Sequence, residues 1–200
     1  MNQVTGIREL ILGGARSGKS TLAERRALEG ADDWPSVVYL ATGEALDAEM
    51  ASRIEHHRQR RPAGWKLVEE PLHLATALRA HAAPDRCLLV DCLTLWLSNL
   101  LHRGKGAAQV EAGKPFSCSL YETETADLLK TLPSLPGRVI LVSNEVGSGI
   151  VPLGALSRLF ADTQGRLNQQ VAAICERVTL VVAGLPLEIK RDDCKPGLPG

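Results

Sequence analysis

Residues 13–20 read Gly-Gly-Ala-Arg-Ser-Gly-Lys-Ser and match the pattern GxxxxGK[ST]. The stretch Glu9–Leu12 before them is predicted as a strand, and Lys19–Leu28 is predicted as a helix. Glycines let the backbone wrap closely around a polyphosphate, and the start of the helix adds the positive end of its dipole. A glycine-rich turn that contains Gly-Lys-Ser by chance is the alternative. The flanking strand and helix favour a loop that holds the phosphates of a nucleoside triphosphate.

Three side chains have expected roles around such a loop. Lys19 is expected to contact the β- and γ-phosphates, and the Ser20 hydroxyl to take a coordination position on Mg²⁺. Asp91 ends the apolar run CLLVD and is the natural carboxylate for the metal, because buried strands rarely end in Asp without a partner. The competing interpretation of Asp91 is an N-cap for a helix over Leu93–Leu101. A phosphate loop by itself does not name the reaction.

Apolar runs alternate with segments of helical period along the chain, which predicts an α/β fold with a mostly parallel sheet flanked by helices. The other predicted strands are Val37–Ala41, Cys87–Asp91, Val139–Ser143 and Val178–Ala183, with a short edge strand at Trp65–Glu69. The other predicted helices are Ala45–Arg60, Leu72–His81, Leu93–Leu101, Leu120–Leu132 and Leu156–Cys175. Residues 103–117 lack periodicity and are predicted as a surface loop. We expect one nucleotide-binding catalytic domain over residues 1–190 and a flexible tail over residues 191–200.

Composition argues against several classes of protein. Lys plus Arg and Asp plus Glu both total 23, so the chain lacks the net positive charge of a protein that coats nucleic acid. No apolar run approaches the roughly 20 residues that span a bilayer, and the first residues lack the order of a secretory signal. The five cysteines are scattered without a CxxC pair, which disfavours a disulfide framework and a zinc site. We therefore expect a reduced, cytoplasmic protein with no nucleic-acid partner and no membrane insertion.

A histidine pair lies near the end of the helix predicted over Ala45–Arg60. It is followed by a polar, mostly basic run, and the full set is His56, His57, Arg58, Gln59, Arg60 and Arg61. Cations are favoured at helix C-termini, so a solvated basic end is the plain interpretation. Helical phase places His57 on the apolar stripe of this helix, with His56 roughly a quarter-turn away. A largely neutral imidazole beside arginines can attack phosphorus, so spacing alone leaves both interpretations open.

Four parts of the chain together resemble the bifunctional adenosylcobinamide kinase/adenosylcobinamide-phosphate guanylyltransferases of cobalamin synthesis. They are LGGARSGKS (12–20), YLATG with DAEMASRIEHHRQRRP (39–43, 47–62), LLVDCLTLWLSNLL (88–101), and VSNEVGSGIVP with GRLNQQVA (142–152, 165–172). The resemblance covers most of residues 12–190 and implies a P-loop NTPase fold of the RecA-like kind. It also implies two reactions on one chain. A nucleoside triphosphate phosphorylates the aminopropanol hydroxyl of adenosylcobinamide, and GMP then passes from GTP through an enzyme histidine to that phosphate, giving adenosylcobinamide-GDP.

The same resemblance implies residue roles. The covalent nucleophile matches His57, with His56 as its neighbour and Lys19 at the phosphates. The positions implied to contact nucleotide are Gly13, Gly14, Ala15, Arg16, Ser17, Gly18, Lys19, Ser20, Ala41, Thr42, Gly43, Arg58, Gln59, Arg60, Arg61, Glu69 and Asp91. From its residues alone, Glu69 is better explained as a solvated charge beside Glu70. GTP, ATP, Mg²⁺, adenosylcobinamide and its phosphate are the implied ligands, and a homo-oligomer, specifically a trimer, is the implied assembly.

Other functions stay open at this point. A P-loop kinase for another small metabolite, with a merely structural histidine pair, predicts phosphoryl transfer but no nucleotidylated enzyme. A RecA-like module acting on nucleic acid or protein is disfavoured by the neutral charge balance. A non-catalytic GTP-binding regulator is weaker still, because no segment resembles a switch. The turn after the strand at Val139–Ser143, residues 144–147, lies where open α/β sheets bind ligands, although a plain strand-to-helix connection explains it equally.

Overall fold

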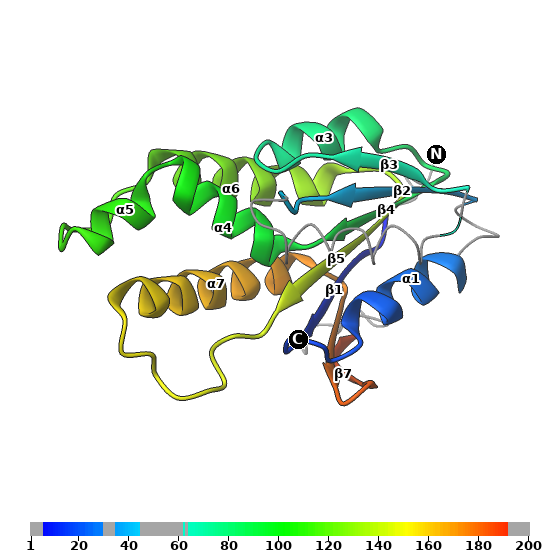
Figure 1. The fold of residues 1–200 in the computed structure, drawn as a ribbon. Coiled ribbons are helices and arrows are strands. Elements are labelled where there is room, and N and C mark those ends of the chain that lie inside the picture. Colours follow the sequence, from blue (N-terminus) through cyan, green and yellow to red (C-terminus); the bar gives the residue numbers. More distant parts are fainter. Residues whose placement is uncertain (1–5, 30–34, 45–61, 63, 192–200) are drawn as a thin grey trace, which may run out of the picture.

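The computed structural model describes residues 6–29, 35–44, 62 and 64–191. Within these residues, one seven-stranded sheet has the order β3-β2-β4-β5-β1-β6-β7 (Figure 1). The strands are β1 (Arg8–Gly13), β2 (Ser36–Ala41), β3 (Lys66–Glu69), β4 (Arg86–Asp91), β5 (Arg138–Asn144), β6 (Arg177–Val182) and β7 (Leu185–Arg191). All pairings are parallel except that of β7, which runs antiparallel to β6. The sequence prediction of a mostly parallel sheet is confirmed.

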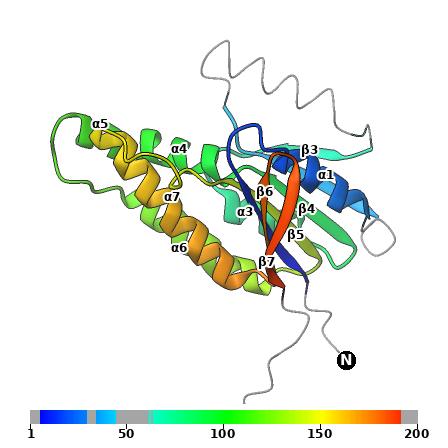
Figure 2. The same cartoon turned by 90° about the horizontal axis from the view of Figure 1, so that it is seen from below.

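Helices cover both faces of the sheet (Figures 1 and 2). They are α1 (Lys19–Glu29), α3 (Leu74–His81), α4 (Leu93–Arg103), α5 (Gly106–Glu111), α6 (Ser119–Thr131) and α7 (Ala155–Ile174), with a 3-10 turn at Leu132–Ser134. The face with α1 has its own apolar cluster, and the face with α3, α4, α6 and α7 has a larger one. In β4, Cys87 and Leu89 pack on the α1 side and Leu88 and Val90 on the other, as strand alternation requires.

A buried ion cluster joins the last turn of α1 to the sheet near the amino end of β1. The Glu9 side chain in β1 is fully buried, and Arg138 of β5 donates to its Oε2 at 3.0 Å. Arg26 of α1 forms an ion pair with the other carboxylate oxygen and donates to Thr179 Oγ1 at 2.9 Å. Burial, as the largest influence, lowers the pKa of both guanidinium groups. The cluster therefore holds two largely buried cations that both contact one buried carboxylate.

Two elements differ from the sequence prediction. The loop predicted over residues 103–117 is wrong in part, because α4 continues to Arg103 and α5 occupies Gly106–Glu111. Gly106 and Ala107 are small enough to be buried, and Ala107 joins the larger apolar cluster, so tertiary packing stabilises a helix too short to show a period. Strand β7 was not predicted. It follows a two-residue turn at Ala183 (φ 50°) and Gly184 (φ 80°), the backbone geometry of a tight hairpin. The predicted helix Ala45–Arg60 lies outside the described residues.

Candidate functional site

The glycine loop connects the carboxyl end of β1 to the first turn of α1, as the sequence predicts. Its backbone is left-handed at Arg16 (φ 58°) and Gly18 (φ 95°). A Cβ at Gly13 would collide with Ser17 Oγ and lie 2.7 Å from the Val181 carbonyl oxygen, so this position requires glycine. The Gly184 N–H donates to the Ser17 carbonyl at 2.9 Å. The hairpin turn between β6 and β7 thus braces the loop, a support that the sequence did not reveal.

Lys19 lies folded across this loop. Its ammonium donates to the Gly14 carbonyl at 3.2 Å. It also acts electrostatically on the Cys92 thiol just past β4, where burial is the dominant influence and raises the thiol pKa to about 11. Lys19 therefore contacts the loop backbone, where its ammonium can exchange the carbonyl for a phosphate oxygen.

Strand register places Glu69, Ala41 and Asp91 in one row along the carboxyl edge of the sheet, with Gly13 and Asn144 two residues further along their strands. Ala41 pairs with Glu69 on one side and with Asp91 on the other, and Gly13 pairs with Asn144. Paired residues of neighbouring strands face the same side of a sheet, and Ala41 packs against the cluster under α1. Asn144 is two residues past Val142 of the same cluster and shares that face. The row thus lies on the α1 side, with the glycine loop.

Asp91 is held by a neighbour from β2. The Tyr39 hydroxyl donates to Asp91 Oδ2 at 2.9 Å, and the carboxylate is half-buried. The N-cap of α4 is Cys92, which makes no side-chain capping bond, so the structure does not support the capping interpretation of Asp91. The Ser20 hydroxyl and the Asp91 carboxylate are hard oxygen donors of the kind that Mg²⁺ prefers. Across the described ranges, no group of three or more His, Cys, Asp or Glu residues is placed to hold a metal ion.

Thr42 ties the end of β2 to the end of β4. It is fully buried, its hydroxyl donates to the Cys92 carbonyl at 2.7 Å, and the Cys92 N–H donates back at 2.9 Å. The Asn99 side chain of α4 donates to the Thr42 carbonyl at 2.7 Å. These bonds fix Ala41 and Gly43, both half-exposed, beside Asp91. Thr42 has the geometry of a positioning residue.

The predicted site residues are brought together only in part. The structure places Gly13–Ser20, Ala41–Gly43, Glu69 and Asp91 at the same edge of the sheet. The histidine pair and the segment after it, His56, His57, Arg58, Gln59, Arg60 and Arg61, lie outside the described residues. Glu69 is exposed at the end of β3. Its neighbour Glu70 accepts the N–H groups of Leu72 and His73 at 3.0 and 2.8 Å and so supports the approach to α3.

A buried amide network at the end of β5 was missed by sequence reasoning. The Ser143 hydroxyl donates to Asn168 Oδ1 at 2.7 Å, and Gln164 Nε2 donates to Ser143 Oγ at 2.9 Å. Asn168 Nδ2 in turn donates to the Asn144 carbonyl at 3.0 Å, while the Asn144 N–H donates to Thr94 Oγ1 at 2.7 Å. Two helices thus fix the backbone of Asn144 beside the glycine loop. Gln164 and Asn168, four residues apart on the helix predicted over Leu156–Cys175, were the available signal.

A parallel sheet with this glycine loop and acidic edge defines a P-loop nucleotide-binding protein of the α/β class. The chain belongs to the family described as "Cobinamide kinase / cobinamide phosphate guanyltransferase", which matches residues 9–189. It is 54% identical over 184 residues to the bifunctional adenosylcobalamin biosynthesis protein CobP of Pseudomonas aeruginosa, covering 92% of this chain and 98% of the relative. It is 44% identical over 182 residues to CobU of Salmonella typhimurium, with 90% and 98% covered. This membership confirms the resemblance seen in the sequence.

Solved structures add support for the fold alone. An ATPase from the type III secretion system of pathogenic bacteria superposes with a TM-score of 0.51 at 14% identity. The match covers 92% of this chain and 57% of the ATPase chain. At that identity the likeness supports the P-loop architecture and no shared activity. None of the helices in the described part of the chain has the length and apolar character to cross a membrane.

Proposed function

We propose that this chain phosphorylates adenosylcobinamide with a nucleoside triphosphate and then transfers GMP from GTP, through a histidine intermediate, to adenosylcobinamide phosphate. The product is adenosylcobinamide-GDP. Membership in a family named for both activities, over residues 9–189, is the observation that carries the proposal. The glycine loop, Lys19 and the acidic edge at Asp91 supply the nucleotide site that both reactions require.

In the kinase step, the aminopropanol hydroxyl attacks the γ-phosphorus. An O–P bond forms, the bond from that phosphorus to the β–γ bridging oxygen breaks, the nucleoside diphosphate leaves, and the hydroxyl proton passes to solvent. Such a transfer needs mainly positioning and charge neutralisation, which the loop N–H groups and Lys19 provide. Ser20 and Asp91 would hold Mg²⁺, which neutralises phosphate charge when bound.

In the guanylyl step, a ring nitrogen of His57 attacks the α-phosphorus of GTP. A P–N bond forms, pyrophosphate leaves, and the other ring nitrogen gives its proton to solvent. A phosphate oxygen of adenosylcobinamide phosphate then attacks the same phosphorus, the P–N bond breaks, and His57 recovers its proton. The intermediate divides one displacement into two easier ones. His56, Arg58, Gln59, Arg60, Arg61 and Glu69 are proposed to bind GTP around this step.

Product analysis tests the proposal. Purified protein with ATP or GTP and adenosylcobinamide should yield adenosylcobinamide phosphate and, with GTP, adenosylcobinamide-GDP. Lys19→Ala should lower kcat/KM of the kinase step on the order of 10²- to 10³-fold. Lys114→Ala, a matched removal of an exposed lysine, should not. If the wild type consumes nucleotide but forms no phosphorylated corrinoid, a kinase for another metabolite would be favoured instead.

We also propose that the chain works as a homo-oligomer, a trimer by resemblance, in the cytoplasm. Support for association comes from apolar side chains of β7 that are more than half exposed, Leu185, Leu187 and Ile189. Support for a reducing compartment comes from Cys87, Cys92, Cys118 and Cys175, which are buried free thiols. Sedimentation equilibrium should give three times the chain mass. A monomer at micromolar concentration would contradict the assembly.

A further inference from the structure

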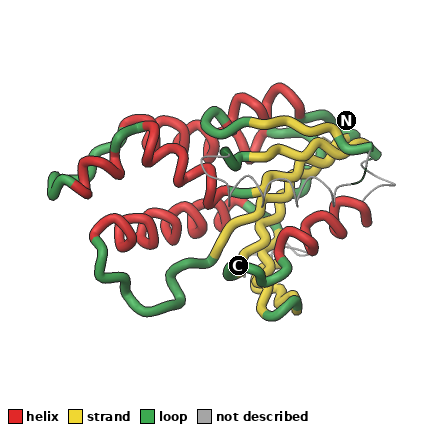
Figure 3. The backbone as a smooth tube through the Cα atoms, in the orientation of Figure 1, coloured by secondary structure: helices red, strands yellow, loops and turns green. Residues whose placement is uncertain are grey.

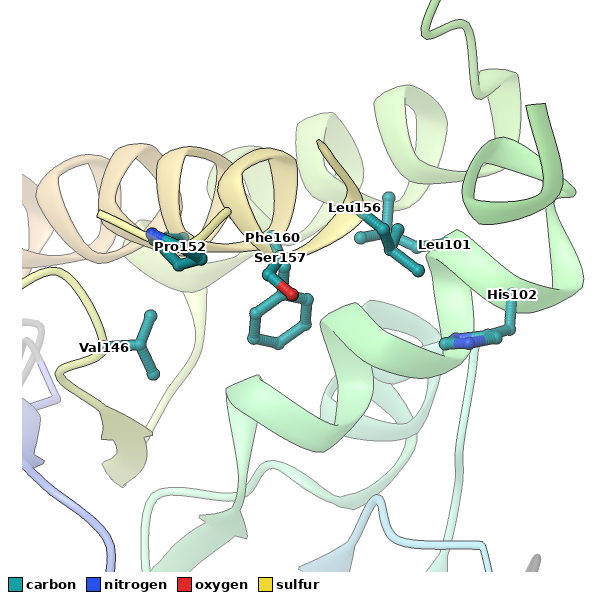
Figure 4. A pocket seen from close by; sticks show the side chains of 8 residues that line it. Leu101, His102, Val146, Pro152, Leu156, Ser157 and Phe160 are labelled. Carbon is teal, nitrogen blue, oxygen red and sulfur yellow. The ribbon is translucent and has the colours of Figure 1, made fainter. Parts of the chain in front are cut away.

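A cavity of about 310 Å³ lies between the end of α4, the start of α7 and the connection from β5 to α7 (Figure 4). Its walls are mostly apolar and come from Leu101, Val146, Pro152, Leu156 and Phe160. The connection, residues 145–154, contains no helix or strand and runs as a long arch (Figure 3). Apolar cavities of this size with few polar groups are the usual form of small-molecule sites.

This cavity begins next to the nucleotide edge. The Glu145 N–H donates to the Gly13 carbonyl at 3.1 Å, and Val146 is the next residue along the chain. With consecutive Cα atoms about 3.8 Å apart, the Val146 and Gly13 Cα atoms lie within roughly 11 Å of each other. The buried amide network fixes the backbone just before this point at Asn144. A molecule in the cavity is therefore a neighbour of the phosphate loop.

Polar atoms are few at this cavity, and one of them has a defined role. His102 Nδ1 bonds to the Ser98 carbonyl at 2.8 Å, and because a carbonyl only accepts, Nδ1 carries the hydrogen. In the neutral ring, Nε2 is then a hydrogen-bond acceptor. Figure 4 shows the ring of His102 at one end of the cavity and the Ser157 hydroxyl between its ends. The cavity thus offers apolar walls and an acceptor at its edge.

Apolar surface continues beyond the cavity along the same connection. Ile150 is 97% exposed, Val151 72% and Leu153 98%, all within the segment that supplies Val146 and Pro152. Clustered large apolar side chains at this exposure mark a surface that another molecule covers. A ligand that fills the cavity with one edge and spreads over these side chains must be larger than the cavity itself.

We propose that this cavity binds the methyl-rich edge of the corrinoid substrate, with His102 Nε2 accepting a hydrogen bond from one of its primary amide arms. The inference rests on the proposed function. A corrinoid is a broad ring with apolar methyl groups and amide side chains, which matches the walls, the acceptor and the exposed apolar arch. The arm that ends in the acceptor hydroxyl extends roughly 8 Å from the ring at ordinary bond spacing, which is comparable with the upper bound of roughly 11 Å between the Val146 and Gly13 Cα atoms.

Filling the cavity tests this assignment. Ser157→Phe adds an aromatic ring at the cavity lining, and Gln169→Phe adds the same ring to an exposed position of α7 away from it. Ser157→Phe should raise both KM and the equilibrium-dialysis Kd for adenosylcobinamide by about tenfold or more. Transfer of GMP from GTP to the enzyme without corrinoid should stay at the wild-type level in both variants. Gln169→Phe should leave all of these values unchanged.

His102 gives an independent variant on an exposed side chain. His102→Phe keeps a ring but removes the acceptor, and should raise the Kd for adenosylcobinamide about fivefold, the usual effect of one lost hydrogen bond. His102→Gln retains an acceptor and should restore most of the affinity.

A Kd for Ser157→Phe within about twofold of wild type would overturn the assignment, since tenfold corresponds to about 1.4 kcal/mol. A changed sedimentation mass for Ser157→Phe would also overturn it, because the cavity would then be a contact between copies of the chain. If the wild-type protein forms no phosphorylated corrinoid, the proposed function itself is refuted. The two failures are therefore distinguishable.

Discussion

The buried carboxylate of Glu9 should carry a large share of the stability of this fold. Glu9→Gln keeps the shape of the side chain and removes the charge that Arg26 and Arg138 share. The two arginine side chains are only 16% and 8% exposed, so water replaces little of the lost interaction. Breaking a buried ion pair by removing one partner costs about 3–5 kcal/mol. For a chain of this size, that corresponds to a fall in Tm of roughly 6–20 °C.

Urea unfolding followed by circular dichroism measures this free energy directly. Glu29→Gln is the surface comparison, because Glu29 pairs with Arg25 on the same helix and both side chains are more than 60% exposed. Glu29 also acts electrostatically on Arg26 and Arg138, but water screens an exposed charge far more than the buried carboxylate of Glu9. Exposed pairs at this helical spacing contribute only about 0.3–0.5 kcal/mol. A loss below about 1 kcal/mol for Glu9→Gln would refute the argument that α1 is anchored by buried charge.

Three further predictions concern the site edge, a surface titration and a buried thiol. Thr42→Val removes the hydroxyl that accepts the Cys92 N–H, while the Cys92 carbonyl still accepts from the Trp96 N–H. The unfolding free energy should therefore fall by about 1–3 kcal/mol in the same urea assay. The Glu124 hydrogen bond raises the pKa of His73, so an NMR titration should place that pKa above about 6.5, and Glu124→Gln should lower it. The stabilisation from this pair is full below the unfolded-state pKa and disappears as pH rises through the folded-state pKa. Burial raises the pKa of Cys87 to about 11, so iodoacetamide at pH 8 should modify it only in urea, as mass mapping will show.

Much of the fold followed from the sequence because its strands are buried on both faces. Unbroken apolar runs such as Cys87–Asp91 occur where a parallel sheet is covered by helices, and each run ends at the edge where ligands bind. The glycine loop added a second constraint, because only glycine fits beside Ser17 at Gly13. These signals are local in the sequence, so they can be recognised without knowledge of the tertiary contacts.

The features that escaped prediction depend on contacts between distant segments. The bond from Tyr39 to Asp91 requires the register of β2 against β4, which no local pattern fixes. Strand β7 begins after an Ala183-Gly184 turn instead of the Asn-Gly or Asp-Gly pair that signals a hairpin, and most of its side chains are exposed. The partners that hold Thr42 likewise come from α4 and the end of β4, more than forty residues away in the chain.

The site residues divide in the same way, into those that a local motif predicts and those that depend on contacts between distant segments. The phosphate loop could be predicted from a local motif with a physical reason for each residue type. Assigning Glu69 to the site required family resemblance, since from its neighbours alone the residue is better explained as a solvated charge. Strand pairing places Glu69, Ala41 and Asp91 in one row, which gives that assignment a geometric basis. The role of His57 stays a prediction, because its segment lies outside the described residues.

The most direct test of the account is transfer of label from α-labelled GTP to the protein itself. We predict stoichiometric labelling that is stable to base and labile to acid, as a phosphoramidate requires. His57→Ala should abolish the label and keep measurable kinase activity, whereas His56→Ala should still take up label. Uptake by His57→Ala at the wild-type level would contradict the two-step mechanism through this histidine.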